Sequence, residues 1–352
     1  MDGAGRSGRG LGSVVTALVT GAGGFIGSWL CKGLIERGQR VVGLDRKLGR
    51  GIRDIHLDAG ERSPPTTLEL LGIETELSSV GCDLTVVDEV ECVIAEHQPS
   101  IVFHLAAEPI VGAASRAPLE AFETNVKGTW NVLEACRRAD VGRVVVASSD
   151  KAYGPATRLP YTEDMPLRPA APYEASKAAA DVVARSYAPA YGLAVAVTRF
   201  ANVYGGGDLN FSRLVPEAVC AALSGRPPVL RSDGSPERDF MHIEDAVAAY
   251  FAVADSLADE ANHGQAFNAG SGAPRRVADV VELIVTLADV DCEPPISEAG
   301  TPEGEIDRQY VDATQLNQAT GWRPQVGLEE GLRRTLDWYA AHPEARPTMA
   351  AA

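Results

Sequence analysis

Two short segments carry side chains with the types and spacing needed for a redox step followed by an elimination. Ser149, Asp150 and Lys151 place a hydroxyl, a carboxylic acid and an amine on consecutive residues. Tyr173 and Lys177 are four residues apart, so on a helix they share one face about one turn apart. A phenol can take a proton from an alcohol while a cofactor removes hydride from the same carbon. The acid and the amine can then remove water from the oxidised product.

These roles require particular protonation states. We predict that the Lys177 ammonium lowers the pKa of the Tyr173 phenol, because a nearby positive charge favours the phenolate. A lysine such as Lys151 can act as a base only in its neutral form, whereas an unperturbed lysine is protonated near neutral pH. The alternative interpretation of Asp150 and Lys151 is a surface ion pair at a strand end that takes no part in catalysis.

A dinucleotide site is predicted upstream of these residues. The β-branched run 14–20 reads as a buried strand, and the apolar periodicity of 25–37 predicts a helix directly after it. Between them lie Gly21, Gly24 and Gly27. Glycines at this spacing permit a tight turn, close approach of a pyrophosphate to the backbone, and close packing of helix on strand.

An acidic residue at the end of the next predicted strand favours NAD over NADP. Asp45 can hold the ribose 2′-hydroxyl and repels a 2′-phosphate, although the adjacent Arg46 could accommodate that phosphate. Asp83 can accept from the adenine amino group or, as an alternative, cap a helix. The predicted cofactor-binding residues are Gly21, Gly24, Phe25, Ile26, Gly27, Asp45, Arg46, Asp83, Leu84, Leu105, Ala106, Ala107, Ser148, Tyr173 and Lys177.

The elements that position these residues alternate regularly. Further strands are predicted at 40–44, 77–82, 100–105, 142–148 and 193–200, separated by helices at 86–97, 117–139 and 173–191. This alternation predicts an α/β fold with a doubly wound parallel Rossmann sheet, assigned to residues 14–200.

The alternation breaks after Asn202. Helices are predicted at 212–224, 243–257, 276–289, 312–319 and 327–340. We assign 201–342 to a smaller α/β substrate-binding lobe that returns some elements to the sheet. Residues 1–13 and 343–352 are expected to be disordered tails.

Composition excludes several classes of function. The chain has 352 residues, with 32 basic and 48 acidic side chains and a net charge of −16, which argues against a nucleic-acid-binding surface. No apolar run reaches the roughly 18 residues that span a bilayer, and the N-terminal residues lack the apolar core of a signal peptide. The six cysteines form no CxxC pair, so we expect reduced thiols, no metal site and a cytoplasmic location.

From about residue 15 to 340 the chain resembles the extended, nucleotide-sugar-modifying branch of the short-chain dehydrogenase/reductase superfamily. The motifs that carry the resemblance are TGAGGFIG at 20–27, HLAAE at 104–108, TNVKGT at 124–129, SSDKAYG at 148–154, YEASK at 173–177, RFANVYGGGD at 199–208, RDF at 238–240, DRQY at 307–310 and GWRP at 321–324.

The residues after the catalytic Ser or Thr divide this branch. Its 4-epimerases typically carry small residues there, dTDP-glucose 4,6-dehydratases carry Asp-Glu, and CDP-glucose 4,6-dehydratases resemble Ser149-Asp150-Lys151. The segment 307–310 is closer to the dTDP-glucose type, so the base stays open. The resemblance implies an NAD-dependent nucleotide-hexose 4,6-dehydratase. The alternatives are a 4-epimerase of the UDP-glucose or UDP-glucuronate type and, third, a non-catalytic NAD-sensing binding protein.

The resemblance also implies roles for individual residues. Tyr173 takes the C4 proton, Ser149 holds the C4 oxygen, Asp150 is the acid and Lys151 the C5 base. The predicted substrate-binding residues are Glu108, Ser149, Asn202, Arg213, Leu214, Arg231, Arg238 and Arg308, with Arg238 and Arg308 on the diphosphate and Asn202 on the sugar–phosphate. Enzymes of this type commonly pair the helices at 117–139 and 173–191 into a homodimer. His104 and His242 are expected to have structural roles.

Overall fold

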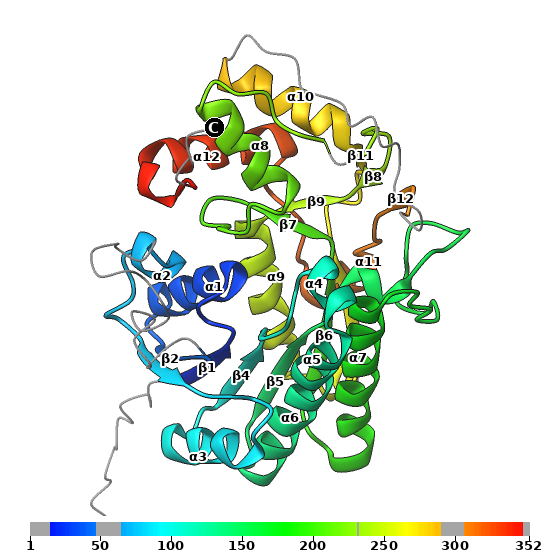
Figure 1. The fold of residues 1–352 in the computed structure, drawn as a ribbon. Coiled ribbons are helices and arrows are strands. Elements are labelled where there is room, and N and C mark those ends of the chain that lie inside the picture. The colour runs from blue at the N-terminus through cyan, green and yellow to red at the C-terminus, as the bar shows by residue number, and fades with distance from the viewer. Residues whose placement is uncertain (1–14, 47–64, 231, 290–305, 348–352) are drawn as a thin grey trace, which may run out of the picture.

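The central sheet of the protein has seven parallel strands and is doubly wound. The structure is a computed structural model, and it describes residues 15–46, 65–230, 232–289 and 306–347. The strand order is β10-β6-β5-β4-β1-β2-β3, which confirms the predicted Rossmann sheet (Figure 1). The strands are β1 (Thr16–Thr20), β2 (Arg40–Asp45), β3 (Ser78–Gly81), β4 (Ile101–His104), β5 (Arg143–Ala147), β6 (Val195–Phe200) and β10 (Ala266–Ala269).

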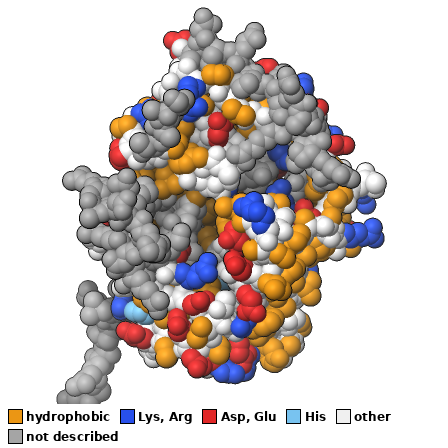
Figure 2. All heavy atoms as spheres, viewed as in Figure 1, with side chains coloured by type: hydrophobic (Ala, Val, Ile, Leu, Met, Phe, Trp, Pro, Cys, Tyr) orange, Lys and Arg blue, Asp and Glu red, His pale blue; other side chains and the backbone are white. Residues whose placement is uncertain are grey.

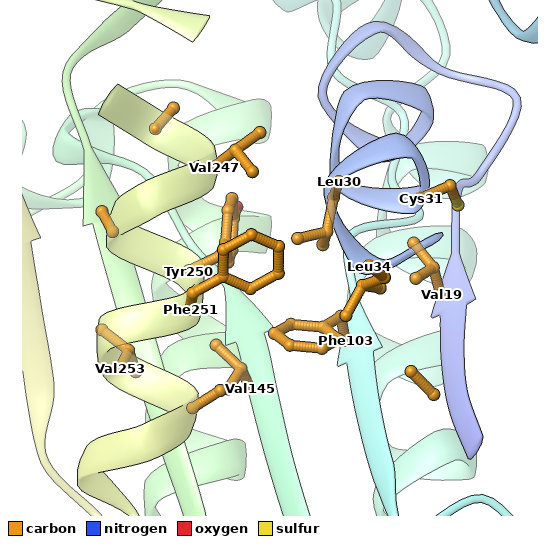
Figure 3. Packing of buried hydrophobic residues seen from close by; sticks show 14 of the residues in the cluster. Val19, Leu30, Cys31, Leu34, Phe103, Val145, Val247, Tyr250, Phe251 and Val253 are labelled. Carbon is orange, nitrogen blue, oxygen red and sulfur yellow. The ribbon is translucent and has the colours of Figure 1, made fainter. Parts of the chain in front are cut away.

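Helices cover both faces of this sheet, so its inner strands are buried and consist mainly of apolar residues. One face packs against α1 (Phe25–Glu36), α9 (Ile243–Ser256) and α11 (Thr314–Thr320). Figure 3 shows part of this core, in which Leu30 and Leu34 of α1 meet Phe251 of α9 over the sheet residues Phe103 and Val145. The other face packs against α3 (Val87–His97), α6 (Gly128–Arg138) and α7 (Pro172–Tyr191).

The chain after Asn202 contributes to both parts of the molecule. It returns α9, β10 and α11 to the sheet and builds a lobe with its own core above the carboxyl ends of the strands (Figure 1). The lobe contains α8 (Leu214–Leu223), α10 (Val277–Ala288) and α12 (Leu328–Ala341), a pair formed by β7 (Asn202–Tyr204) and β9 (Phe240–His242), and a three-stranded sheet of β11 (Arg275–Arg276), β8 (Glu237–Arg238) and β12 (Arg308–Gln309).

Short helical segments complete the fold. The predicted helix 117–139 is instead α5 (Pro118–Phe122), a π-helical turn η2 (Glu123–Lys127) and then α6, because the wider turn brings the Asn125 side chain inside. The remaining segments are α2 (Thr67–Leu70), α4 (Val111–Arg116), and the 3₁₀ helices η3 (Asp150–Tyr153), η4 (Glu260–Asn262) and η5 (Pro343–Ala345).

Two sequence predictions concern the ends and the membrane. The prediction of a disordered tail from residue 343 is wrong for residues 343–347, because η5 packs Ala345 into the lobe core. Residues 1–13 and 348–352 lie outside the described residues. Within the part of the chain that the structure describes, none of the helices combines the length and apolarity needed to cross a bilayer.

Candidate active site

A single cavity gathers most of the predicted site residues. It has a volume of about 1140 Å³ and opens where β1, β2, β4 and β5 end beneath the lobe, the place where ligands bind in sheets of this topology. Every predicted catalytic and cofactor-binding residue lines it, and so do the predicted substrate residues Glu108, Ser149, Asn202, Arg213 and Leu214.

The glycine loop after β1 packs closely against the neighbouring backbone. Gly21 has φ +73, and a Cβ atom there would lie 2.8 Å from the Ala106 amide nitrogen. A Cβ atom on Gly27 would lie 2.1 Å from the Gly21 carbonyl oxygen, so only glycine lets α1 pack this closely. Helix α1 begins after Gly24 without a side-chain cap, which leaves its first amide groups available to an anion.

Acidic residues stand beside this loop at the ends of β2 and β3. The Asp45 carboxylate is so near the loop that a Cβ atom on Gly23 would lie 3.2 Å from its Oδ2. Asp83 Oδ1 accepts from the Thr85 amide at 2.9 Å and from the Thr85 hydroxyl at 2.8 Å. Burial by itself would raise the pKa of Asp83. The hydrogen bonds from Thr85 and the positive charge of Arg46 outweigh burial, so the pKa of Asp83 is lowered. One oxygen of Asp83 therefore stabilises the turn before α3, but Asp83 does not cap that helix, whose N-cap residue is Val86 and has no side-chain cap hydrogen bond.

His104, at the end of β4, is buried and remains neutral. Its Nδ1 lies 2.8 Å from Thr20 Oγ1 and its Nε2 lies 2.9 Å from Thr129 Oγ1. Because the Thr129 hydroxyl donates to the Asn125 carbonyl, Nε2 carries the proton and Nδ1 accepts from Thr20. Burial, aided by the positive charge of Lys177, lowers the pKa of His104 to about 3. The histidine therefore links β1 and β4 to α6 and does not exchange protons with a substrate.

Tyr173 and Lys177 lie on one face of α7, as their spacing predicts. The Lys177 ammonium donates to the Ala147 carbonyl at 3.0 Å, and burial lowers its pKa to about 8. Burial raises the pKa of the Tyr173 phenol to about 12, against the opposing effects of Arg213 and of a hydrogen bond with Ser149. The prediction that the phenol has a lowered pKa is therefore wrong for the chain by itself, because the loss of hydration outweighs the nearby positive charges.

A buried hydrogen-bond chain fixes the start of α7 behind Tyr173. The Asn125 amide donates to Ser176 Oγ at 2.8 Å, and the Ser176 hydroxyl donates to the Tyr173 carbonyl at 2.7 Å. Asn125 Oδ1 in turn accepts from the Glu108 amide at 2.7 Å. Asn125 lies within the motif at 124–129, but its residue type and spacing alone predict no role for it.

Asp150 and Lys151 line the cavity on η3, immediately after β5. Asp150 is 2% exposed, so it does not belong to a surface ion pair. Burial raises its pKa to about 6; Lys151 opposes this shift and the nearby Asp239 adds to it. Its Oδ1 accepts from the Ser149 hydroxyl at 3.2 Å, whereas its Oδ2 is buried without a partner among the described residues.

Replacing Asp150 by asparagine should stabilise the fold at pH 8 by about 3 kcal/mol. The folded-state pKa of about 6 lies above the ordinary value of 3.8, so the stability that Asp150 contributes is complete below the ordinary pKa and is lost as the pH rises through 6. An amide stays neutral, so the variant should gain over the wild type only at higher pH. Thermal unfolding between pH 4 and 8 measures this difference, and a pH-independent difference would contradict it.

The predicted arginines are divided between the cavity and the lobe. Arg213 lines the cavity and its Nη1 lies 3.2 Å from Asp208 Oδ2. Arg238 is buried in β8, where its Nη1 donates to the Glu237 carbonyl at 2.9 Å. The Arg308 side chain is 52% exposed and pairs with Glu237 Oε2 at 2.6 Å. Neither Arg238 nor Arg308 is among the residues lining the cavity, because the β8–β12 pairing holds them beside it.

The remaining residues considered in the sequence are Arg231, Asn202 and His242. Arg231 lies outside the described residues. Asn202 lines the cavity, and its amide donates to the Asp239 carbonyl at 3.2 Å. His242 Nδ1 accepts from the Glu244 amide at 3.4 Å and caps α9. Burial lowers the pKa of His242 to about 4, so this histidine has a structural role.

Comparison with known proteins places this geometry in a family. The profile described as the NAD dependent epimerase/dehydratase family matches residues 17–270. A UDP-glucose 4-epimerase from Mycolicibacterium smegmatis is 35% identical over 329 residues, which cover 92% of this chain and 97% of that protein. A dTDP-glucose 4,6-dehydratase from Xanthomonas campestris pv. campestris is 33% identical over 345 residues, with 93% of each chain covered.

A solved structure agrees with these matches. The dTDP-glucose 4,6-dehydratase DesIV from Streptomyces venezuelae, with NAD bound, superposes with a TM-score of 0.79 and 30% identity over 93% of this chain and 97% of its own. Epimerases and dehydratases therefore match at similar identity, and both kinds depend on the same cofactor chemistry. On its sequence, its sheet and its glycine loop, the chain belongs to the NAD dependent epimerase/dehydratase family, and its cofactor is NAD.

Proposed function

We propose that this protein is an NAD-dependent nucleotide-hexose 4,6-dehydratase, which converts a nucleoside-diphosphate hexose into its 4-keto-6-deoxy form and water. The observation that carries the proposal is Asp150, a buried carboxyl group on the cavity wall next to Lys151. It has a pKa of about 6, and one of its oxygens has no hydrogen-bond partner among the described residues. An acid with this pKa can both donate and recover a proton near neutral pH. A 4-epimerase requires neither residue.

The chain offers a matching place for each part of the cofactor. The loop Gly21–Gly27 and the first amides of α1 would hold the pyrophosphate, and Asp45 would accept from the adenosine ribose. Ala106 and Ala107 leave space for the nicotinamide beside Lys177. When bound, NAD supplies the hydride acceptor for C4, the hydride donor for C6 and a positive charge that favours the Tyr173 phenolate.

The side chains of the site then account for the proton transfers. Tyr173 takes the C4 hydroxyl proton while Ser149 hydrogen-bonds the C4 oxygen, which leaves a ketone as hydride departs from C4. The ketone acidifies the C5 proton, which the Lys151 amine accepts. Asp150 gives its proton to the C6 hydroxyl, and the C6–O bond breaks to release water. Lys151 would return its proton to C5, while C6 would receive the hydride that bound NAD supplies.

An assay with nucleotide sugars tests this proposal. Purified protein is incubated with CDP-, dTDP-, UDP- and GDP-hexoses, and the products are weighed by mass spectrometry. Loss of one water is expected from at least one of them, and Asp150→Asn and Lys151→Ala should abolish that loss. An isomer of unchanged mass would instead identify a 4-epimerase, the second candidate, which the 35% identity to the UDP-glucose 4-epimerase favours.

The third candidate, a binding protein that senses NAD without chemistry, has its own test. If Tyr173→Phe left the cellular role of the protein unchanged, catalysis would not be its function. The presence of Ser149, Tyr173 and Lys177 together on the cavity wall argues against this candidate.

We also infer a homodimer formed through α5, α6 and α7. These helices expose large apolar side chains, namely Leu119 at 78%, Val182 at 61% and Trp130 at 44%. Figure 2 shows hydrophobic side chains gathered over this side of the molecule. Sedimentation of the wild type and of Val182→Glu tests the inference, with a dimer expected for the first and a monomer for the second.

A further inference from the structure

Gln309 contacts the proposed C5 base from outside the cavity. It lies in β12, opposite Arg238 of β8, and its side chain is 0% exposed. Its Oε1 accepts from Lys151 Nζ at 3.5 Å, although the two residues are 158 positions apart in the chain. Lys151 lines the cavity and Gln309 does not, so the amide reaches the amine from the lobe side.

The orientation of this amide is determined by Lys151. Among the described residues, Gln309 Nε2 is buried without a hydrogen-bond partner, a state that costs free energy. Turning the amide over would point its N–H groups at the donors of Lys151. The unpaired nitrogen is therefore the consequence of presenting an acceptor to the amine, and such exceptions in a buried site call for a functional explanation.

We propose that Gln309 is a positioning residue that aims Lys151 at the C5 proton, an inference that rests on the dehydratase function proposed above. A neutral amine has two N–H bonds and one lone pair. Donation of one N–H to Gln309 restricts rotation about the Cε–Nζ bond and so directs the lone pair into the cavity.

The Gln309 side chain accepts a hydrogen bond without carrying a charge. A carboxylate at the same place would also accept from Lys151, but its negative charge would favour the ammonium form, which cannot accept a proton. The charged groups around the pair already include Asp150, Asp239 and Arg238. Glutamine adds an acceptor to this cluster without changing its charge.

Two variants separate position from charge. Gln309→Met has a similar length and no acceptor, so elimination should slow by about 10- to 100-fold while C4 oxidation stays within about two-fold of wild type. Reduced cofactor should then accumulate during a single turnover, measured by its absorbance. Gln315→Met is the matched control, because Gln315 donates to the Ala266 carbonyl at 3.0 Å in another part of the fold.

Gln309→Glu keeps the acceptor and adds a charge. The pH at which C5 deprotonation begins should rise by about one to three units. Exchange of the C5 proton with solvent deuterium measures this step separately from C4 oxidation. A residue with a purely structural role would not move this pH profile.

The outcomes distinguish the two proposals. If the wild type removes water but Gln309→Met and Gln309→Glu keep its elimination rate and pH profile, the inference about Gln309 is wrong and the dehydratase function stands. If Gln309→Met does not fold, the pH profile of Gln309→Glu decides. If the wild type removes water from none of the nucleotide sugars, the dehydratase function fails and the role of Gln309 fails with it.

Discussion

Tyr173→Phe should lower the rate of C4 oxidation by about 10³-fold, the size expected when a positioned acid–base group is lost. Phenylalanine fills the same buried space but has no oxygen to accept the substrate proton or to hydrogen-bond Ser149. Both dehydration and epimerisation begin with this oxidation, so both activities should fall together. Formation of bound reduced cofactor in a single turnover, followed by absorbance, measures the step.

The controls for this variant come from the same helix. Tyr191, at the end of α7, is 60% exposed, so Tyr191→Phe should leave the rate unchanged. Thermal unfolding should confirm that Tyr173→Phe folds, since the phenyl ring keeps the apolar packing. A rate within ten-fold of wild type would show that another group removes the C4 proton.

Breaking the ion pair between Arg199 and Asp181 should reduce the free energy of unfolding by about 3 to 5 kcal/mol. The two side chains are 1% and 0% exposed and are joined by hydrogen bonds of 2.8 and 2.9 Å between β6 and α7. Arg199→Met leaves a buried carboxylate without its partner, and Asp181→Asn leaves a buried guanidinium without a counter-charge. Urea unfolding of each variant measures the loss.

Two comparisons test whether the loss of stability arises because the ion pair is buried. The pair between Arg333 and Glu329 is exposed, so Arg333→Met should change stability little. The double variant Arg199→Met with Asp181→Leu should be more stable than either single variant, because no charge is then left unpaired. If the double variant were the least stable, the contribution of the pair would have to come from packing.

The ion pair also supports the catalytic segment. The Arg199 guanidinium donates to the Tyr153 hydroxyl at 2.9 Å, and Tyr153 ends the 3₁₀ helix that begins at Asp150. The Tyr153 hydroxyl donates to Asn268 Oδ1 at 2.8 Å, on β10. Residues from two strands, β6 and β10, thus hold η3 at the cavity wall, and loss of Arg199 is expected to disturb Asp150 as well as the fold.

The features that the sequence predicted correctly depend on neighbours along the chain. Buried strands such as β5 contain unbroken apolar runs, here residues 144–147, and the glycines at 21, 24 and 27 are required by a turn formed within a few residues. The spacing of Tyr173 and Lys177 puts them on one helical face whatever surrounds the helix. The sheet, the glycine loop and the composition of the cavity wall could therefore be predicted from residue types and spacing.

Properties that depend on residues far apart in the chain were decided by the tertiary structure. Burial raised the pKa of Tyr173, whereas the nearby Lys177 had indicated a lowered pKa from the sequence. Pairing of β8 with β12 held Arg238 and Arg308 beside the cavity and brought Gln309 to Lys151. Hydration and electrostatic energy are sums over all surrounding atoms, whereas periodicity reports only which face of an element is apolar. The sequence alone thus determined which groups could react. The packed fold determined their charge, their orientation and the residues that support them.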